Sequence, residues 1–158
     1  MRGKAWALAR TAVFTVFVPG TVAGYLPYAI LRNAGWDSPP VVIWCAAVLV
    51  LSFGLALYLV CAWRFSVDGL GTPAPIDPPR TLVARGPYRF TRNPMYVAVL
   101  AVIAGEALLA RSTTLAVYGV AVFAFFFAFV VLYEEPVLSA KFGGAYDAYR
   151  AAVPRWVL

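Results

Sequence analysis

Residues 41–63 form a continuous apolar run that contains no charged side chain. A run of about 20 apolar residues is long enough to cross the hydrocarbon core of a bilayer as an α-helix. Only 13% of the 158 residues are charged and 63% are hydrophobic, whereas about 25% of the residues of an ordinary soluble domain are charged. The chain is therefore predicted to be an integral membrane protein.

The sequence contains three further apolar stretches, so we predict an all-α fold. It is expected to be a polytopic membrane helical bundle of about four transmembrane helices, forming a single domain over residues 1–158. The four predicted spans cover residues 11–31, 41–63, 94–110 and 113–133. Pro19, Gly20 and Gly24 are expected to bend the first span.

The tail after the fourth span mixes acidic, basic and apolar residues. Glu135-Pro136 is expected to end the fourth helix or to offset its axis, and a new helix can begin there. Apolar and aromatic side chains recur in this tail at helical spacing, at Val137, Leu138, Phe142, Tyr146 and Tyr149. We therefore predict a C-terminal amphipathic helix that lies on the cytoplasmic membrane face.

The basic residues are distributed unevenly over the predicted loops and termini. Of the 13 Lys and Arg residues, only Arg32 and Arg111 fall on one side of the four-span arrangement. The positive-inside rule therefore places both termini and the long loop of residues 64–93 in the cytoplasm, with the protein in the inner or plasma membrane. The net charge of +6 is explained by this topology and by contact with membrane lipids, so no nucleic-acid partner is expected.

Residues 86–96 combine arginines, tyrosines and prolines immediately before the third span. Pro87 and Pro94 fix their own φ angles and disfavour helical geometry at Gly86 and Asn93. We expect an ordered non-helical segment here, followed by a helix that begins at Pro94.

An acidic pair, Glu134 and Glu135, follows the fourth span. Acidic residues at a helix C-terminus interact unfavourably with the helix dipole. Their presence here therefore indicates a specific role for this pair. A short hairpin at Arg111-Ser112 makes the third and fourth spans antiparallel neighbours, which brings the pair to the same membrane face as residues 86–96. We predict that the two motifs form a pocket over which the tail closes.

Glu106 lies inside the third span, and the sequence assigns it no catalytic role.

The chain contains no histidine. This excludes Ser-His-Asp and Cys-His triads and any histidine general base. Cys45 and Cys61 lie on one predicted helix, about 24 Å apart at 1.5 Å per residue, so they cannot form a disulfide with each other. With no histidine and no CxxC spacing, no metal site is expected.

Several motifs follow one another in the second half of the chain. They are Arg85-Gly86-Pro87-Tyr88, Arg92-Asn93-Pro94-Met95-Tyr96, Glu134-Glu135-Pro136-Val137-Leu138, Phe142-Gly143, Tyr146 with Tyr149, and Val153-Pro154. With this ordered set the chain resembles the isoprenylcysteine carboxyl methyltransferase family, including its bacterial members and its phospholipid methyltransferase relatives. The resemblance covers residues 71–158.

The resemblance implies an enzyme, an integral membrane methyltransferase that uses S-adenosylmethionine. The cofactor would bind among the last two spans and the tail, and a lipophilic or prenylated substrate would approach sideways from the bilayer. A carboxylate is the expected acceptor, because its methylation needs no general base and the chain has no histidine.

The implied cofactor site consists of Arg85, Gly86, Pro87, Tyr88, Arg92, Asn93, Pro94, Tyr96, Glu134 and Glu135. Within it, the expected catalytic residues are Arg92, Glu135 and Tyr96. Arg92 would bind the cofactor carboxylate, and Glu134 or Glu135 would bind its ammonium or a ribose hydroxyl. Tyr88 and Tyr96 would face the adenine or the sulfonium.

The chain departs from the pattern of the prenylcysteine enzymes, which usually have histidines where this chain has Arg85 and Asn93. Those enzymes also tend to carry an arginine about one turn before the acidic pair, where this chain has Val130 and Val131. The acceptor can therefore also be another amphipathic lipid acid, amine or thiol. Two other functions stay open at this point. One is an NADPH-dependent membrane reductase of the sterol type, and the other is a non-catalytic membrane interaction module.

Overall fold

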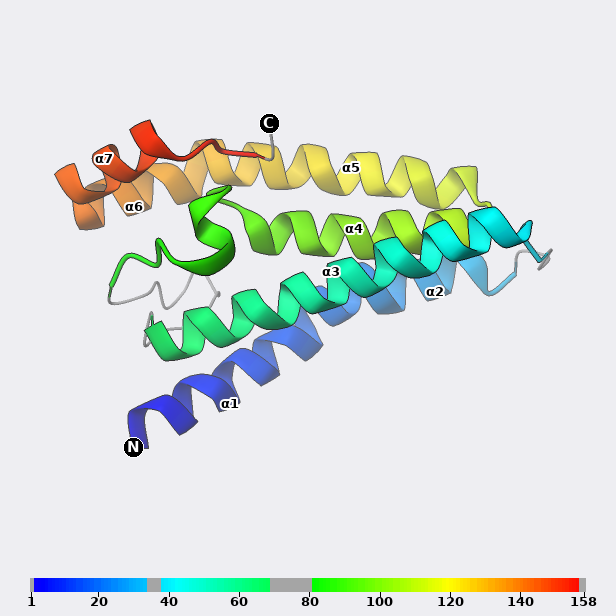
Figure 1. The fold of residues 1–158 in the computed structure, drawn as a ribbon, viewed down its shortest axis with the longest axis horizontal. Helices are drawn as coiled ribbons and strands as arrows, with labels where there is room; N and C mark the ends of the chain where they lie inside the picture. The colour runs from blue at the N-terminus through cyan, green and yellow to red at the C-terminus, as the bar shows by residue number, and fades with distance from the viewer. Residues whose placement is uncertain (1, 34–37, 69–80, 157–158) are drawn as a thin grey trace.

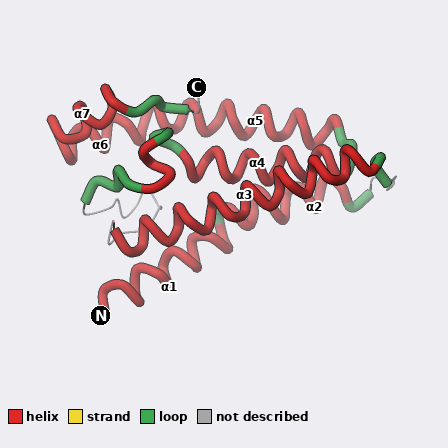
Figure 2. Tube along the Cα trace, in the orientation of Figure 1, coloured by secondary structure: helices red, strands yellow, loops and turns green. Residues whose placement is uncertain are grey.

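The structure is a computed structural model, and it describes residues 2–33, 38–68 and 81–156. Every regular element in these ranges is a helix or a helical turn, as Figure 2 shows. The prolines between residues 73 and 79 of the predicted long loop lie outside the described residues, as do parts of the loop between the first two spans.

The helices pack side by side in an elongated bundle (Figure 1). The first half contains α1 (Arg2–Phe17), the π-helical turn η1 (Thr21–Tyr25), α2 (Leu26–Leu31) and α3 (Val41–Asp68). The second half contains the 3-10 turn η2 (Gly86–Arg89), α4 (Pro94–Leu109), α5 (Thr113–Phe129), the π-helical turn η3 (Val130–Glu134), α6 (Glu135–Phe142) and α7 (Gly144–Ala152). The start of α1, η2 and the α6–α7 pair all lie at one end of the bundle.

Three helical stretches are long and apolar enough to cross a membrane, namely Ala9–Leu31, Val41–Ser66 and Thr113–Phe142. The fourth apolar helix, α4, has only 16 residues, as expected for the short third span. At 1.5 Å per residue it is about 24 Å long, less than the thickness of the hydrocarbon core. The prediction of a helical membrane bundle is confirmed.

The first span is bent where the sequence predicts. Helix α1 ends at Phe17, and the chain continues through η1 into α2. Inside η1, Ala23 leaves helical geometry, with φ −111° and ψ 17°. Pro19 cannot donate a helical hydrogen bond, which accounts for the interruption just after it.

Two local predictions are wrong. Residues 86–89 of the segment expected to be non-helical form the 3-10 turn η2, although Gly86 has a φ of 61° and Asn93 departs from helical geometry as predicted. Of the two alternatives for Glu135-Pro136, an end of the fourth helix is wrong, because the helical stretch continues from Thr113 to Phe142. The turn η3 widens the helix, and Pro136 then occupies the first turn of α6, where its missing N–H costs little. Helix α6 does begin at Glu135, where a new helix was predicted.

The break in the tail occurs at Gly143 instead. This glycine has a φ of 52° and separates α6 from α7. The amphipathic helix is therefore α7, which begins at Gly144 rather than near Pro136. Figure 1 shows that the chain folds back here and that its last described residues return along α5.

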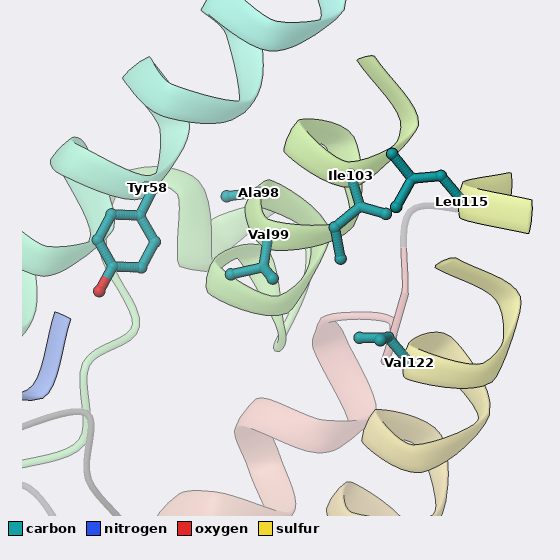
Figure 3. Close-up of a cluster of buried hydrophobic side chains, with 6 residues drawn as sticks. All are labelled: Tyr58, Ala98, Val99, Ile103, Leu115 and Val122. Carbon is teal, nitrogen blue, oxygen red and sulfur yellow. The ribbon is translucent and has the colours of Figure 1, made fainter. Parts of the chain in front are cut away.

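Helices α3 and α4 form the most extensive helix pair of the bundle. They approach closely at Gly54, where a Cβ atom would lie 2.9 Å from the Ala98 carbonyl oxygen and 2.9 Å from the Val102 backbone nitrogen. Beside this contact, a buried cluster joins α3, α4 and α5 (Figure 3), consisting of Tyr58, Ala98, Val99, Ile103, Leu115 and Val122. Helix α4 is thus the central element of the bundle.

The Gly54 contact gives a first testable prediction. Gly54→Leu should destabilise the protein by about 2 kcal/mol or more, because the side chain meets backbone atoms of α4 that cannot move aside. Gly24→Leu is the matched control, since nothing lies within 4 Å of a Cβ atom there. The thermal unfolding midpoints of both variants in detergent test this, and equal midpoints would show that the helices can move apart at no cost.

Candidate functional site

A cavity of about 440 Å³ lies at the end of the bundle that contains η2, η3 and α7. Its walls come from α1, η1, α3, α4 and α5 as well as from η3, α6 and α7. Within the spanning segments it is lined by Phe14 of α1, by Val18 just after α1, and by Phe125 and Phe129 of α5. Charged residues line it where α4 begins and where η3 continues into α6. The cavity therefore joins the apolar interior of the membrane segment to a charged pocket.

Glu135 is held by two arginines. Arg92 Nη1 donates to Glu135 Oε1 at 2.7 Å, and the side chains of both residues are only 9% exposed. Arg155 binds the same carboxylate with two bonds, from Nε to Oε1 at 2.8 Å and from Nη2 to Oε2 at 2.9 Å. The bond to Glu135 raises the pKa of Arg155 above its usual value. Both oxygens of Glu135 are thus used by cations of the chain itself.

Glu134 has a different environment. Tyr96 donates its hydroxyl hydrogen to Glu134 Oε2 at 2.7 Å, and the Tyr96 ring packs on Phe126 with a centroid distance of 4.7 Å. Glu134 lines the cavity, and it has no ion pair within the described part of the chain. It is therefore a carboxylate whose charge no arginine or lysine of the described residues neutralises.

The end of the chain is bound to the segment that precedes α4. Arg92 N donates to the Pro154 carbonyl oxygen at 2.9 Å. Thr91 Oγ1 and Asn93 Nδ2 both donate to the Arg155 carbonyl oxygen, at 2.9 and 3.0 Å. These bonds fix the backbone from which Arg155 reaches Glu135.

Aromatic contacts fix the same tail on α5. The Trp156 ring lies 5.4 Å from Phe123 in an edge arrangement and 6.4 Å from Phe127 in a stacked one. The Arg155 guanidinium lies 5.9 Å from the centre of the Phe127 ring, a distance at which a cation and an aromatic face attract each other. The tail is thus held on both sides, by residues 91–93 and by α5.

Three tyrosines complete the pocket. Tyr149 donates its hydroxyl hydrogen to the Tyr88 carbonyl oxygen at 2.7 Å, which joins α7 to η2. Burial raises the pKa of Tyr149 to about 12 and that of Tyr88 well above its usual value, so both phenols stay protonated at neutral pH. The Arg92 Nη1 group also lies 3.4 Å from the buried Tyr146 hydroxyl.

The structure brings six of the predicted site residues to the cavity wall. These are Tyr88, Arg92, Asn93, Tyr96, Glu134 and Glu135. The other four predicted residues do not line the cavity: Arg85 is exposed, Gly86 and Pro87 lie in η2, and Pro94 is buried at the start of α4. Their effect on the site is through the backbone that they shape.

Arg155 was not among the predicted site residues, although it makes the most complete ion pair there. No clear signal for it is present in the sequence, because the predicted site already contained two arginines, Arg85 and Arg92, for the two glutamates. Glu106 lies outside the cavity lining, and its Oε2 is buried with no hydrogen-bond partner among the described residues.

A comparison with protein families gives one match. The profile of the phospholipid methyltransferase family matches residues 42–145, which run from the start of α3 into α7 and include Arg92, Tyr96, Glu134 and Glu135. The chain belongs to the phospholipid methyltransferase family. This membership confirms the family-level prediction from the motifs and places the chain among membrane methyltransferases. Searches among curated proteins and among solved structures gave no match.

Methyltransferases generally use S-adenosylmethionine, and the pocket residues of this family member fit its charges. The cofactor has an ammonium, a carboxylate and a sulfonium cation. Glu134 offers an unneutralised carboxylate, and Arg92 is a buried guanidinium whose Nε has no hydrogen-bond partner among the described residues. The cavity volume of about 440 Å³ also falls in the range of about 300–1,000 Å³ found for small-molecule sites.

The unequal pairing of the two glutamates gives a second prediction. Glu135→Gln should destabilise the protein by about 3 kcal/mol, because removing one partner of a buried ion pair leaves the other charge uncompensated. Glu134→Gln is the matched control, and it should change the thermal midpoint little, because the amide oxygen still accepts from Tyr96. Equal losses in the two variants would contradict the structural role of Glu135.

Proposed function

We propose that this family member transfers a methyl group from S-adenosylmethionine to a lipophilic acceptor. The observation that carries the proposal is the different pairing of the adjacent acids. Glu135 is neutralised by Arg92 and Arg155, whereas Glu134 faces the cavity with no ion pair in the described part of the chain. A pocket with one free carboxylate attracts a cationic ligand.

Bound S-adenosylmethionine supplies an electrophilic methyl group on a sulfonium. Glu134 is the group that binds the ammonium or a ribose hydroxyl, and the Tyr96 hydroxyl keeps its carboxylate in place. The remaining donors of Arg92 are suited to the ligand carboxylate. The aromatic rings of Tyr88 and Tyr96 in the wall are suited to the adenine or the sulfonium.

Methyl transfer of this kind depends mainly on alignment and on the exclusion of water. Arg92 contacts both Glu135 and Tyr146, and Tyr96 is held by its hydrogen bond to Glu134 and by the contact of its ring with Phe126. Tyr146 and Tyr149 of α7 lie over the pocket and help to separate it from water. No histidine is present to act as a base, which favours a carboxylate acceptor over an amine or a thiol.

The acceptor is proposed to be lipophilic because the cavity extends between α1 and α5. Val18 and Phe125 line it, and these two residues are 46% and 65% exposed. The wall of the cavity therefore reaches the surface that faces lipid. An isoprenylcysteine-like molecule or another lipid can enter there from the bilayer with its reactive group toward the charged pocket.

The orientation in the membrane follows from the basic residues. The start of α1, η2 and the α6–α7 pair share one end of the bundle, and most of the arginines and lysines belong to these segments and to the long loop. We place this end, both termini and the pocket in the cytoplasm, with membrane lipids as the surrounding partners.

Calorimetric titration of the detergent-purified protein with S-adenosylhomocysteine tests the cofactor, with NADPH titrated in parallel. Saturable binding of S-adenosylhomocysteine alone is expected. Glu134→Gln should weaken it by at least about tenfold, since a hydrogen bond to a charged group contributes about 1.5–3 kcal/mol. The variant should fold normally, as the thermal midpoint reports.

The parallel titration separates the other possibilities. Binding of NADPH alone would contradict the proposal and point to a reductase. Binding of neither by the folded protein would favour an interaction module. If Glu134→Gln binds S-adenosylhomocysteine as tightly as the wild type does, the proposed methyltransferase activity stands, but the assignment of Glu134 as the cation-binding residue is wrong.

A further inference from the structure

Arg155 lies outside the part of the chain that matches the family profile, which ends at residue 145. It nevertheless binds Glu135, a residue of the cavity wall, through two parallel bonds of 2.8 and 2.9 Å. Arg155 itself does not line the cavity. Its influence on a ligand must therefore pass through the residues it contacts.

The first of these is Glu135, whose carboxylate is shared. Among the described residues, Oε2 accepts from Arg155 alone, and Oε1 accepts from both Arg155 and Arg92. A planar guanidinium that binds a carboxylate with two parallel bonds is the stronger of the two partners. The bond from the Arg92 side chain to Glu135 comes from a single nitrogen atom, Nη1, and the Nε atom has no hydrogen-bond partner among the described residues.

The backbone of Arg155 is fixed independently of this ion pair. Its carbonyl oxygen accepts from Thr91 and Asn93, which flank Arg92 in the sequence. The neighbouring Trp156 packs on Phe123 and Phe127 of α5. The guanidinium is therefore presented to Glu135 from a preformed support, and little conformational entropy is lost when the pair forms.

The charges of the pocket residues determine which charge of Arg92 or of the glutamates is available to a ligand. With Arg155 present, the charge of Glu135 is neutralised by the tail, and the charge of Arg92 is available to another anion. Without Arg155, Arg92 would be the one remaining cation of the described residues in direct contact with the buried Glu135 carboxylate. Two arginines, one neutralised glutamate and one free glutamate leave a pocket with one available charge of each sign, which is the pattern of an amino-acid zwitterion.

We propose that Arg155 is a positioning residue, which neutralises Glu135 so that Arg92 can bind the carboxylate of an amino-acid-like ligand. This inference rests on the proposed function, because S-adenosylmethionine is the ligand with that zwitterionic group. It adds a residue of the C-terminal tail to the determinants of cofactor affinity.

The test compares three variants, Arg155→Met, Arg155→Lys and the double variant Glu135→Gln/Arg155→Met. S-adenosylhomocysteine affinity is measured by calorimetry, and the thermal midpoint is measured without ligand. Arg155→Met should weaken binding about tenfold, since a charged hydrogen-bonding partner is lost. Arg155→Lys should lose less, because the charge is kept and only the two-bond geometry is lost.

The double variant distinguishes positioning from a purely structural role. Removing the charge of Glu135 releases Arg92, so the double variant should bind S-adenosylhomocysteine more tightly than Arg155→Met does. A tail that only holds the fold together predicts no recovery, and that result would overturn the proposal. Arg89→Met is the matched control, since Arg89 is exposed on η2 and does not line the cavity; its affinity should equal that of the wild type.

The remaining outcomes are also decisive. If the wild type binds and Arg155→Met binds equally tightly, this inference is wrong while the proposed function stands. If the folded wild type does not bind S-adenosylhomocysteine, the proposed function fails and the inference with it. If Arg155→Met does not fold, Arg155→Lys replaces it in both comparisons, and an affinity equal to that of the wild type then overturns the proposal.

Discussion

The ion pairs of Glu135 connect three parts of the chain that are far apart in the sequence. Arg92 belongs to the segment before α4, Glu135 begins α6, and Arg155 belongs to the tail. Because the Arg92 and Glu135 side chains are only 9% exposed, their charges are withdrawn from water and each depends on the other. The Arg155 side chain is 33% exposed, and it lies between the Arg92–Glu135 ion pair and water. The position of the charged pocket follows from this arrangement.

The same arrangement assigns different tasks to two neighbouring acids. Glu135 is paired within the fold, and we propose that Glu134 binds a ligand. Glu134 is the last residue of the π-helical turn η3, and Glu135 follows it as the first residue of α6. Such turns in α-helices often occur at functional sites. A membrane methyltransferase needs a charged pocket that opens toward lipid, and the cavity between α1, α4 and α5 combines both properties.

The sequence was sufficient for features that depend on local chemistry. The apolar runs predict the spans, Pro19 predicts the bend after α1, and Pro94 predicts the start of α4. The proximity of Arg92 to the acidic pair is also predicted from the sequence. A short hairpin makes α4 and α5 antiparallel, so the start of α4 and the end of α5 lie at the same end of the bundle.

Features that depend on tertiary contacts could not be predicted. The helix continues through Pro136 because a π-helical turn accommodates the proline. No residue pattern in the sequence predicts that turn. Arg155 reaches Glu135 only because residues 91–93 and α5 hold the tail. The contribution of Arg155 therefore becomes visible only in the folded chain.

The most direct test of the account is methyl transfer itself. The purified protein, reconstituted in vesicles made from bacterial lipid extract, would be incubated with S-adenosylmethionine labelled in its methyl group. We expect label to enter the lipid-soluble fraction with the wild type and, at a cofactor concentration below the wild-type Kd, about tenfold more slowly with Glu134→Gln. Saturable binding of S-adenosylhomocysteine without any label in that fraction, or label that appears only in water-soluble products, would contradict a lipophilic acceptor.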